Sequence, residues 1–327
     1  MRRNAHAGRA RRDGCEFRVL TDDDLADIHL GTLEVLERTG VFVEDDEALQ
    51  LFEEAGAEVD RERSVVHLPP HLVEDAVRSA PSTVVMYGRD PKHDVVLEDG
   101  RVGFTNFGEG VQIVDPYTGE LRVPVKQDVA NTAKVVDALP NVDVYERAVV
   151  AEDIDQRVVH LHQYQAWATN TSKHGFMGSG NGYLSKKLVE MASAIAGGRE
   201  KLKERPIISF ITCPVSPLKL VKDTCEIIMT GAREYVAVNI LSMAMAGGSS
   251  PVTLAGTLVT HNAEVLAGIT LSQLTRPGAA VVYGSSTTSM DLRLASASVG
   301  SPECALINAA VAQIARFYLL PSWVAGA

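Results

Sequence analysis

The feature that most constrains the fold is an alternation, after about residue 128, of short apolar runs with longer segments of helical periodicity. The apolar runs cover residues 142–150, 175–178, 206–212, 235–242 and 279–283, and a sixth begins at 321. Short continuous apolar runs are typical of parallel strands buried on both faces. A helical segment follows each of the first five, so the repeat is roughly 30 to 40 residues, the size of one βα unit. The pattern predicts an α/β fold, a TIM (β/α)8 barrel of which about six units are present.

An open doubly wound sheet is the alternative to a barrel. That architecture binds nucleotides through a glycine-rich turn after its first strand, and no such turn follows residues 142–150. The barrel is therefore favoured. Because the sequence ends at Ala327 within a segment that resembles the start of a sixth strand, we expect the last two barrel units to be missing.

Three sequence regions follow from composition and pattern. Residues 1–18 contain a basic run and are predicted to be a disordered arm, with binding of an acidic partner surface as the alternative. Residues 19–127 are predicted to be an α+β elaboration with helices in 21–56, a short helix from His71 and a β-rich stretch over 83–123. The first helix begins at a capping sequence, Thr21 to Asp24. Residues 128–327 are predicted to form the incomplete barrel.

Charge and cysteine usage limit the partners and the compartment. The chain has a formal net charge of -11, which argues against general nucleic-acid binding because phosphate neutralisation requires clustered Lys and Arg. No apolar run approaches the ~18 residues of a membrane span. Four scattered cysteines without a CxxC pair indicate a reducing compartment. We therefore predict a cytoplasmic protein with no membrane and no nucleic-acid partner.

Candidate binding residues lie near the carboxyl ends of the predicted barrel strands, where barrel enzymes place their chemistry. Asn239 and Tyr283 are near the ends of the fourth and fifth strands, and Glu303 opens the next helix. Helix capping alone would explain Glu303. The loops over 243–251 and 284–301 exceed a minimal connection and are either functional or plain surface loops. Phe107, Tyr117 and Trp323 either contribute to an aromatic cage for a quaternary ammonium group or pack in the core.

Other polar segments give weaker signals. His160 and His162 are two residues apart on a predicted helix, so they face different directions and do not predict a metal site. Residues 178–182 resemble a phosphate-binding loop but lack the lysine, which favours a turn. His261 falls in the middle of a predicted helix, as expected of a surface or packing residue. No metal ligand set is predicted.

Several long segments are similar to the trimethylamine:corrinoid methyltransferase family, and the resemblance covers essentially the whole chain. Its early parts are Gly108-Glu109-Gly110 and the segment 115–119. The later parts are 283–288, 298–303, 305–310 and 320–326. The resemblance implies a (β/α)8 barrel that transfers a methyl group from trimethylamine to the Co(I) corrinoid of a partner protein, in methylamine-dependent methanogenesis or related anaerobic C1 metabolism.

The resemblance also implies the identity of the catalytic residue. Trimethylamine-specific members of the family carry pyrrolysine, encoded by an in-frame amber codon, on the strand that this chain enters last. We therefore expect the catalytic residue beyond Ala327 and assign it to no position here. A TAG codon followed by an open reading frame is what this expectation predicts. Addition of the amine to the pyrrolysine imine would give a quaternary ammonium adduct, which Glu303 or Glu109 would stabilise electrostatically.

The resemblance leaves the substrate and the assembly open. Related members without pyrrolysine demethylate quaternary amines such as glycine betaine, and a catalytically inactive fragment is a further alternative. An unrelated barrel lyase or isomerase would require a lysine or metal cluster at the strand ends, which the sequence lacks. The family implies a corrinoid held by a partner protein and no cofactor bound directly. It also implies a small methylated amine as substrate and a homo-oligomer. Tyr283, Glu303, Asn239, Phe107, Glu109 and Trp323 are the predicted substrate-binding residues.

Overall fold

A computed structural model describes residues 9–10 and 17–325, and the chain divides into two compact units. Within the described residues, unit 1 contains 9–10, 85–211 and 234–236, and unit 2 contains 17–84, 212–233 and 237–325. The predicted boundaries at 1–18, 19–127 and 128–327 stay predictions. Residues 1–8 and 11–16 of the predicted basic arm lie outside the described residues, as do 326–327 at the other end.

Unit 1 contains the first three parallel strands and their helices. Strand β10 pairs with β11, and β11 with β12, in parallel and in chain order. Helices α4, α5 and α6 pack in sequence against one another or against these strands. The bounds are α4 Lys126–Ala138, β10 Val144–Glu146, α5 Val159–Asn170, β11 His174–Gly178, α6 Gly182–Ala196, α7 Arg199–Glu204 and β12 Ile208–Thr212. This is the predicted βα repeat.

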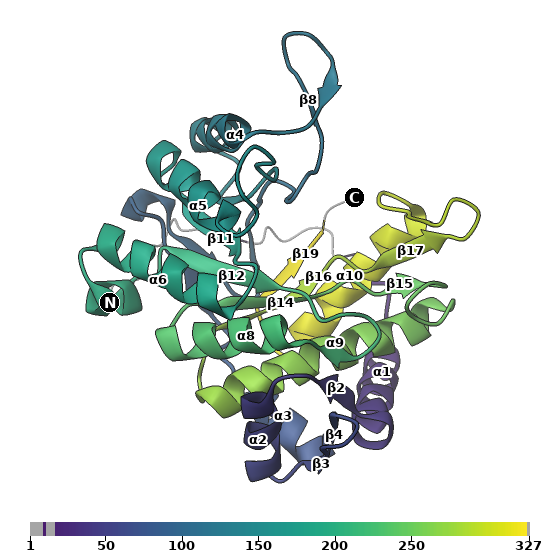
Figure 1. Ribbon diagram of the computed structural model, residues 1–327. Coiled ribbons are helices and arrows are strands. Elements are labelled where there is room, and N and C mark those ends of the chain that lie inside the picture. The colour runs from purple at the N-terminus through teal and green to yellow at the C-terminus, as the bar shows by residue number, and fades with distance from the viewer. Residues whose placement is uncertain (1–8, 11–16, 326–327) are drawn as a thin grey trace. The chain divides into compact units, whose positions relative to one another are not determined.

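The segment before α4 in unit 1 consists of short strands, as predicted for residues 83–123. They are β1 Arg9–Ala10, β5 Val84–Met86, β6 Val95–Leu97, β7 Arg101–Val102, β8 Ile113–Val114 and β9 Leu121–Arg122, with a 3-10 turn η2 at Pro91–His93. Strands β1 and β7 pair antiparallel, as do β8 and β9. The β8–β9 hairpin extends away from α4, as Figure 1 shows.

Unit 2 contains three further parallel strands and is organised around one buried helix. Strand β16 pairs in parallel with β14 and with β19. Most residues of helix α9 are buried all round the helix. A helix that is apolar on every side is expected at the centre of a domain. Helices α9 and α10 lie along β14 and β16 (Figure 1). The bounds are β13 Lys219–Leu220, α8 Lys222–Glu234, β14 Val238–Ser242, β15 Met245–Ala246, α9 Leu254–Thr275, β16 Val281–Ser285, β17 Thr288–Asp291, β18 Ser296–Ala297, α10 Pro302–Phe317 and β19 Ser322–Val324.

The N-terminal part of unit 2 packs on α9. Helices α1, α2 and α3 all contact that helix. The capping box predicted at Thr21 is present, with Asp24 N donating to Thr21 Oγ1 at 3.1 Å. Three short strands that the sequence did not reveal join a sheet with β13. The bounds are α1 Asp22–Glu34, a π-helical turn η1 Val35–Thr39, β2 Val41–Val43, α2 Asp46–Glu54, β3 Glu58–Asp60, β4 Val65–His67 and α3 Pro70–Ser79.

Six parallel strands within the described residues, the first five each followed by a helix, confirm the predicted α/β class of the (β/α)8 barrel type. None of the helices in the described ranges combines the length and hydropathy needed to cross a membrane.

Candidate functional site

The carboxyl end of β10 in unit 1 carries a buried carboxyl group, Glu146. Side chains alternate along a strand, so neighbours face opposite sides of the sheet. The Tyr145 hydroxyl donates to the Val129 carbonyl oxygen of α4 at 3.3 Å, which places Tyr145 on the helix side. Glu146 therefore lies on the side away from the helices, in register with Phe176 of β11. In a (β/α)8 barrel that side is the interior.

The burial of Glu146 favours its protonated form. The residue is 5% exposed, and Oε2 has no hydrogen-bond partner within the described residues. Burial, reinforced by the negative charge of Glu109, raises the pKa of the Glu146 carboxyl to about 8, although Arg147 acts in the opposite direction. At neutral pH the group is a neutral carboxylic acid.

The loop over residues 103–110 covers Glu146 with its backbone. Asn106 fastens this loop to β10, because its Nδ2 donates to the Glu146 carbonyl oxygen at 2.7 Å and its Oδ1 accepts from the Glu146 N–H at 3.1 Å. A Cβ atom on Gly108 would lie 2.3 Å from Glu146 Oε1. Only glycine fits at this approach, and the loop thereby excludes water from that side of the carboxyl.

Arg147, which follows β10, is the centre of a second set of contacts. Its Nη2 pairs with Glu109 Oε1, and its Nη1 donates to Gln163 Oε1 at 2.6 Å. Nη1 also lies 2.8 Å from His160 Nδ1. Burial and the Arg147 charge lower the pKa of His160. The charge of Arg147 is thus matched by Glu109, and His160 is neutral at pH 7.

The pairing of Arg147 depends on the backbone at two positions. Glu109 adopts φ 64°, an uncommon left-handed conformation for a residue other than glycine, and its N–H donates to the Arg147 carbonyl oxygen at 2.7 Å. At Gly178, which ends β11, a Cβ atom would lie 2.5 Å from Glu109 Oε1. The 178–182 segment is the turn that the sequence favoured, with Asn181 capping α6 through Leu184 N at 2.9 Å.

The raised pKa of Glu146 gives a prediction about stability. Folding raises this pKa from 4.5 to about 8, so the folded protein holds the proton more tightly than the unfolded chain does between these values. Stability from this group is therefore present at acid pH and lost as the pH rises toward 8. Glutamine at position 146 does not ionise, so it removes this loss of stability. We expect Glu146→Gln to raise the free energy of unfolding by roughly 2–4 kcal/mol at pH 8 and by little at pH 4.5.

Urea unfolding of both proteins at the two pH values measures this difference. Glu152→Gln, a change at an exposed carboxylate of the same unit, is the matched control and should show no pH-dependent difference. Equal differences between wild type and Glu146→Gln at both pH values would contradict the protonated state of Glu146.

In unit 2, Asn239 presents a second buried polar group. It is 0% exposed, and neither Oδ1 nor Nδ2 has a hydrogen-bond partner within the described residues. The next residue, Ile240, faces α9, since its side chain lies 2.7 Å from where a Gly268 Cβ would be. Asn239 therefore faces away from α9. Gly284 of β16 lies on the same side, in register with Leu241 and with Trp323 of β19.

Two other predicted binding residues of unit 2 lie elsewhere. Tyr283 is fully buried on the helix side of β16, where its hydroxyl donates to Asn262 Oδ1 of α9 at 2.6 Å. Burial raises its pKa well above the usual value. Glu303 is exposed in the first turn of α10, after Ser301, whose hydroxyl accepts from Cys304 N at 3.2 Å. These placements are consistent with packing for Tyr283 and helix capping for Glu303, and their roles in binding stay predictions.

The two long loops predicted after β14 and β16 form a small sheet in unit 2. Strand β15 pairs in parallel with β17, which pairs antiparallel with β18. Buried polar contacts hold the first residues of each loop. Ser242 Oγ, at the end of β14, donates to Glu264 Oε2 of α9 at 2.6 Å, and Thr287 Oγ1 lies 2.8 Å from His261 Nδ1. Burial lowers the pKa of His261 to about 3, so it is a neutral packing residue.

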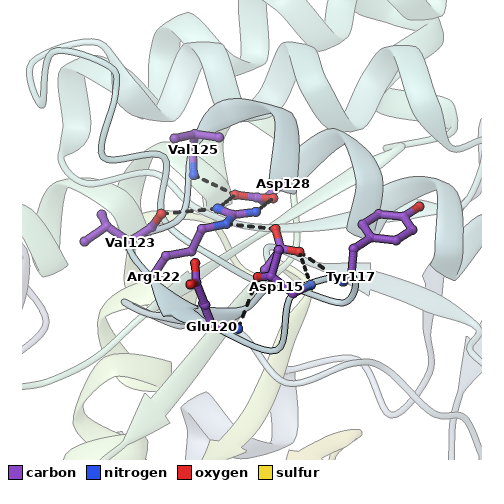
Figure 2. Close-up of polar contacts among 8 residues, drawn as sticks. Asp115, Tyr117, Glu120, Arg122, Val123, Val125 and Asp128 are labelled. Carbon is purple, nitrogen blue, oxygen red and sulfur yellow. Dashed lines mark hydrogen bonds and ion pairs between the residues drawn. The ribbon is translucent and has the colours of Figure 1, made fainter.

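The aromatic residues Phe107 and Tyr117 are exposed in unit 1, with exposed fractions of 65% and 96%. Tyr117 lies in the turn of the β8–β9 hairpin, which Figure 2 shows in detail. Arg122 at the end of the hairpin makes a bidentate pair with Asp128 of α4, at 2.7 and 2.8 Å, and contacts Asp115 at 3.2 Å. The Arg122 guanidinium lowers the pKa of Asp128.

These contacts predict that Arg122 holds the hairpin on α4. In Arg122→Ala, Asp115 and Asp128 lose the cation that they share. The segment around the exposed Tyr117 should then open locally more often. We therefore expect chymotrypsin to cleave within 111–123 several-fold faster than in the wild type. Arg157→Ala, which removes an exposed ion pair with Asp155 in the same unit, is the control and should leave that rate unchanged. Unaltered cleavage in Arg122→Ala would contradict the anchoring role.

Glu146 and Arg147 are the residues that sequence reasoning missed. The predicted strand over 142–150 ran past both residues, whereas β10 ends at Glu146, so nothing in the sequence indicated that they lie at a strand end. Glu109, which the resemblance pointed to as a substrate-binding residue, lies beside Arg147, which matches its charge; its role in binding stays a prediction. Within the described residues, no group of three or more His, Cys, Asp or Glu side chains is arranged to hold a metal ion.

Comparison of the whole chain with known proteins shows which family it is similar to. A family model described as trimethylamine methyltransferase (MTTB) matches residues 2–327. The trimethylamine methyltransferase MttB of Desulfitobacterium hafniense is 52% identical over 326 residues, covering 100% of this chain and 66% of that protein. MttB of Methanosarcina thermophila is 47% identical over 328 residues, covering 99% of this chain and 68% of that protein. The chain spans about two thirds of the length of these curated relatives.

More distant relatives extend the comparison. A glycine betaine methyltransferase of Desulfitobacterium hafniense is 37% identical over 309 residues, covering 94% of this chain and 64% of that protein. The crystal structure of the Methanosarcina barkeri monomethylamine methyltransferase (MtmB) is similar with a TM-score of 0.55 at 14% identity, and the match covers 98% of this chain and 69% of that one. At this identity the structural likeness concerns the fold alone.

Proposed function

Since the chain belongs to the trimethylamine methyltransferase family, we propose that it transfers a methyl group from trimethylamine to the Co(I) corrinoid of a partner protein. The observation that carries the proposal is the 52% identity, over the whole chain, to a protein named for this activity. The buried carboxyl at the end of β10 supports it, because a low-dielectric site with an ionisable acid suits a cationic amine.

The corrinoid belongs to the partner in this proposal and acts as the methyl acceptor. The chain's own residues bind and orient the amine. When the reacting groups themselves carry out the bond changes, holding them in the reactive geometry supplies a large share of the rate enhancement. A homo-oligomer is proposed from family membership, as the resemblance implied.

Two sets of residues are proposed for amine binding, one in each unit. In unit 1 they are Glu146 and the neighbouring Glu109, with Phe107 on the covering loop. In unit 2 they are Asn239, whose buried amide has no hydrogen-bond partner among the described residues, and Trp323, which lies in register with Gly284. An amide oxygen would accept a hydrogen bond from a protonated amine, and an indole face would attract its charge.

A quaternary amine such as glycine betaine is the second candidate substrate. The 37% identity to a glycine betaine methyltransferase favours its inclusion, although the trimethylamine relatives are more similar. A quaternary ammonium group needs no proton removal before methyl transfer, so the two substrates place different demands on the site.

The test uses the product of the complete gene together with its cognate corrinoid protein reduced to Co(I). Trimethylamine and glycine betaine are supplied separately, and methyl-Co(III) formation is followed by its absorbance spectrum. We expect methylation of the corrinoid with trimethylamine. Methylation with glycine betaine alone would reassign the substrate, and no methylation with either amine would overturn the proposal.

A further inference from the structure

The charges around the end of β10 are balanced except for one carboxyl group. Arg147 carries the cation of the cluster and is paired with Glu109. The His160 pKa is lowered by burial, so this side chain from α5 adds no positive charge at pH 7. On β11, burial lowers the pKa of His174 to about 4, and its Nε2 lies 2.9 Å from Ser209 Oγ. Glu146 thus has no counter-ion of its own.

Two features at Glu146 favour an organic cation as its ligand. Oε2 lies on the side of β10 that faces away from the helices and has no hydrogen-bond partner among the described residues. Phe176, next to Glu146 in the strand register, adds an aromatic ring to the same side. A carboxylate beside an aromatic ring is a common recognition device for alkylammonium groups, which carry diffuse charge and few hydrogen-bond donors.

We propose that Glu146 is the anionic part of an alkylammonium subsite at the end of β10, and that cation binding expels the proton held by this carboxyl group. The O–H bond of the carboxylic acid breaks, the proton passes to solvent, and the carboxylate keeps the electron pair and faces the bound cation. This inference rests on the proposed function for the class of its ligand. It adds the residue that carries the charge and a coupling between binding and proton release.

The coupling follows from electrostatics. In the empty site, ionisation of Glu146 would bury a charge next to Glu109, which is unfavourable. A cation at Oε2 reverses this balance because the opposite charge favours the ionised carboxylate. The ligand therefore binds the ionised form, and binding below the pKa of the free site releases a proton.

The test is calorimetric titration with tetramethylammonium chloride in the absence of corrinoid protein. Tetramethylammonium carries no N–H, so any released proton comes from the protein. Titration in two buffers with different ionisation enthalpies gives the number of protons. With a Glu146 pKa of about 8, we expect close to one proton per bound cation at pH 7 and an affinity that rises about tenfold between pH 7 and pH 9.

Two variants decide the assignment. Glu146→Gln should release no proton, bind the cation at least tenfold more weakly at pH 9, and show no rise in affinity with pH. Glu152→Gln, at an exposed carboxylate of the same unit, should match the wild type. Absence of binding, binding without proton release, or unchanged behaviour in Glu146→Gln would each overturn the inference.

The outcomes are separable from those of the proposed function. Corrinoid methylation by trimethylamine without proton release on tetramethylammonium binding would leave the function standing and remove the Glu146 subsite. Proton release that depends on Glu146, without corrinoid methylation, would keep the subsite and remove the methyl-transfer function.

Discussion

Replacement of Glu264 by leucine is expected to lower the free energy of unfolding by about 3–5 kcal/mol, because it removes the acceptor of one buried and two partly buried donors. Glu264 is fully buried on α9 and accepts from Ser216 Oγ at 2.8 Å, from Leu218 N at 3.1 Å and from Ser242 Oγ at 2.6 Å. These contacts tie the loop after β12 and the end of β14 to one helix of unit 2. Urea unfolding at pH 7 measures the change.

The matched control for Glu264 is Glu37→Leu, a change at an exposed glutamate of the same unit, which should alter the free energy of unfolding by no more than about 0.5 kcal/mol. Glu264→Gln keeps one acceptor oxygen and should be intermediate. A Glu264→Leu protein as stable as the control would show that the three donors find other partners.

Gly284→Ala should destabilise the protein by about 1–3 kcal/mol, because β16 and β14 have no room for an additional methyl group. The new Cβ would lie 2.1 Å from Asn239 Oδ1 and 2.9 Å from the Leu241 Cα atom of the paired strand. Truncation of Asn239 to alanine removes the closer contact. We therefore expect the double variant to recover at least half of the lost stability, a coupling that a double-mutant cycle measures.

Asn239→Ala alone separates packing from binding. Its amide has no hydrogen-bond partner among the described residues, so truncation should change the free energy of unfolding by less than about 1 kcal/mol. If Asn239 binds substrate as proposed, the same variant should raise the KM for the amine. If the effects of Gly284→Ala and Asn239→Ala on the free energy of unfolding simply add in the double variant, then Gly284 is required for a reason other than the Asn239 side chain.

The βα repeat was predictable because it depends on local patterns. The strands at 206–212 and 235–242 are apolar runs bounded by turn residues, and the helix predicted over 252–274 is found as α9, Leu254–Thr275. Strands β2, β3 and β4 were missed because each has three residues, too few for a period-2 pattern to stand out.

The candidate site was only partly predictable. Glu109 was predicted from the family resemblance and Asn239 from its place near a strand end, and the binding roles of both stay predictions. Tyr283 shows the limit of that reasoning, since a residue at a strand end can face the helices as easily as the interior. Its hydroxyl contact with Asn262 depends on how α9 packs on β16, which strand periodicity does not specify.

The sequence by itself determined the repeat, the helix caps and the family, because each of these is a property of neighbouring residues or of long matching segments. Only the tertiary structure decided which acid lacks a counter-charge. Arg147 is adjacent to Glu146 in the chain but pairs with Glu109, 38 residues away. The loop over 103–110 brings Glu109 to the arginine, so the adjacent Glu146 is left without an ion pair of its own among the described residues. Charge balance in a site depends on distances in space, so it emerges only after the strands and the covering loop are assembled.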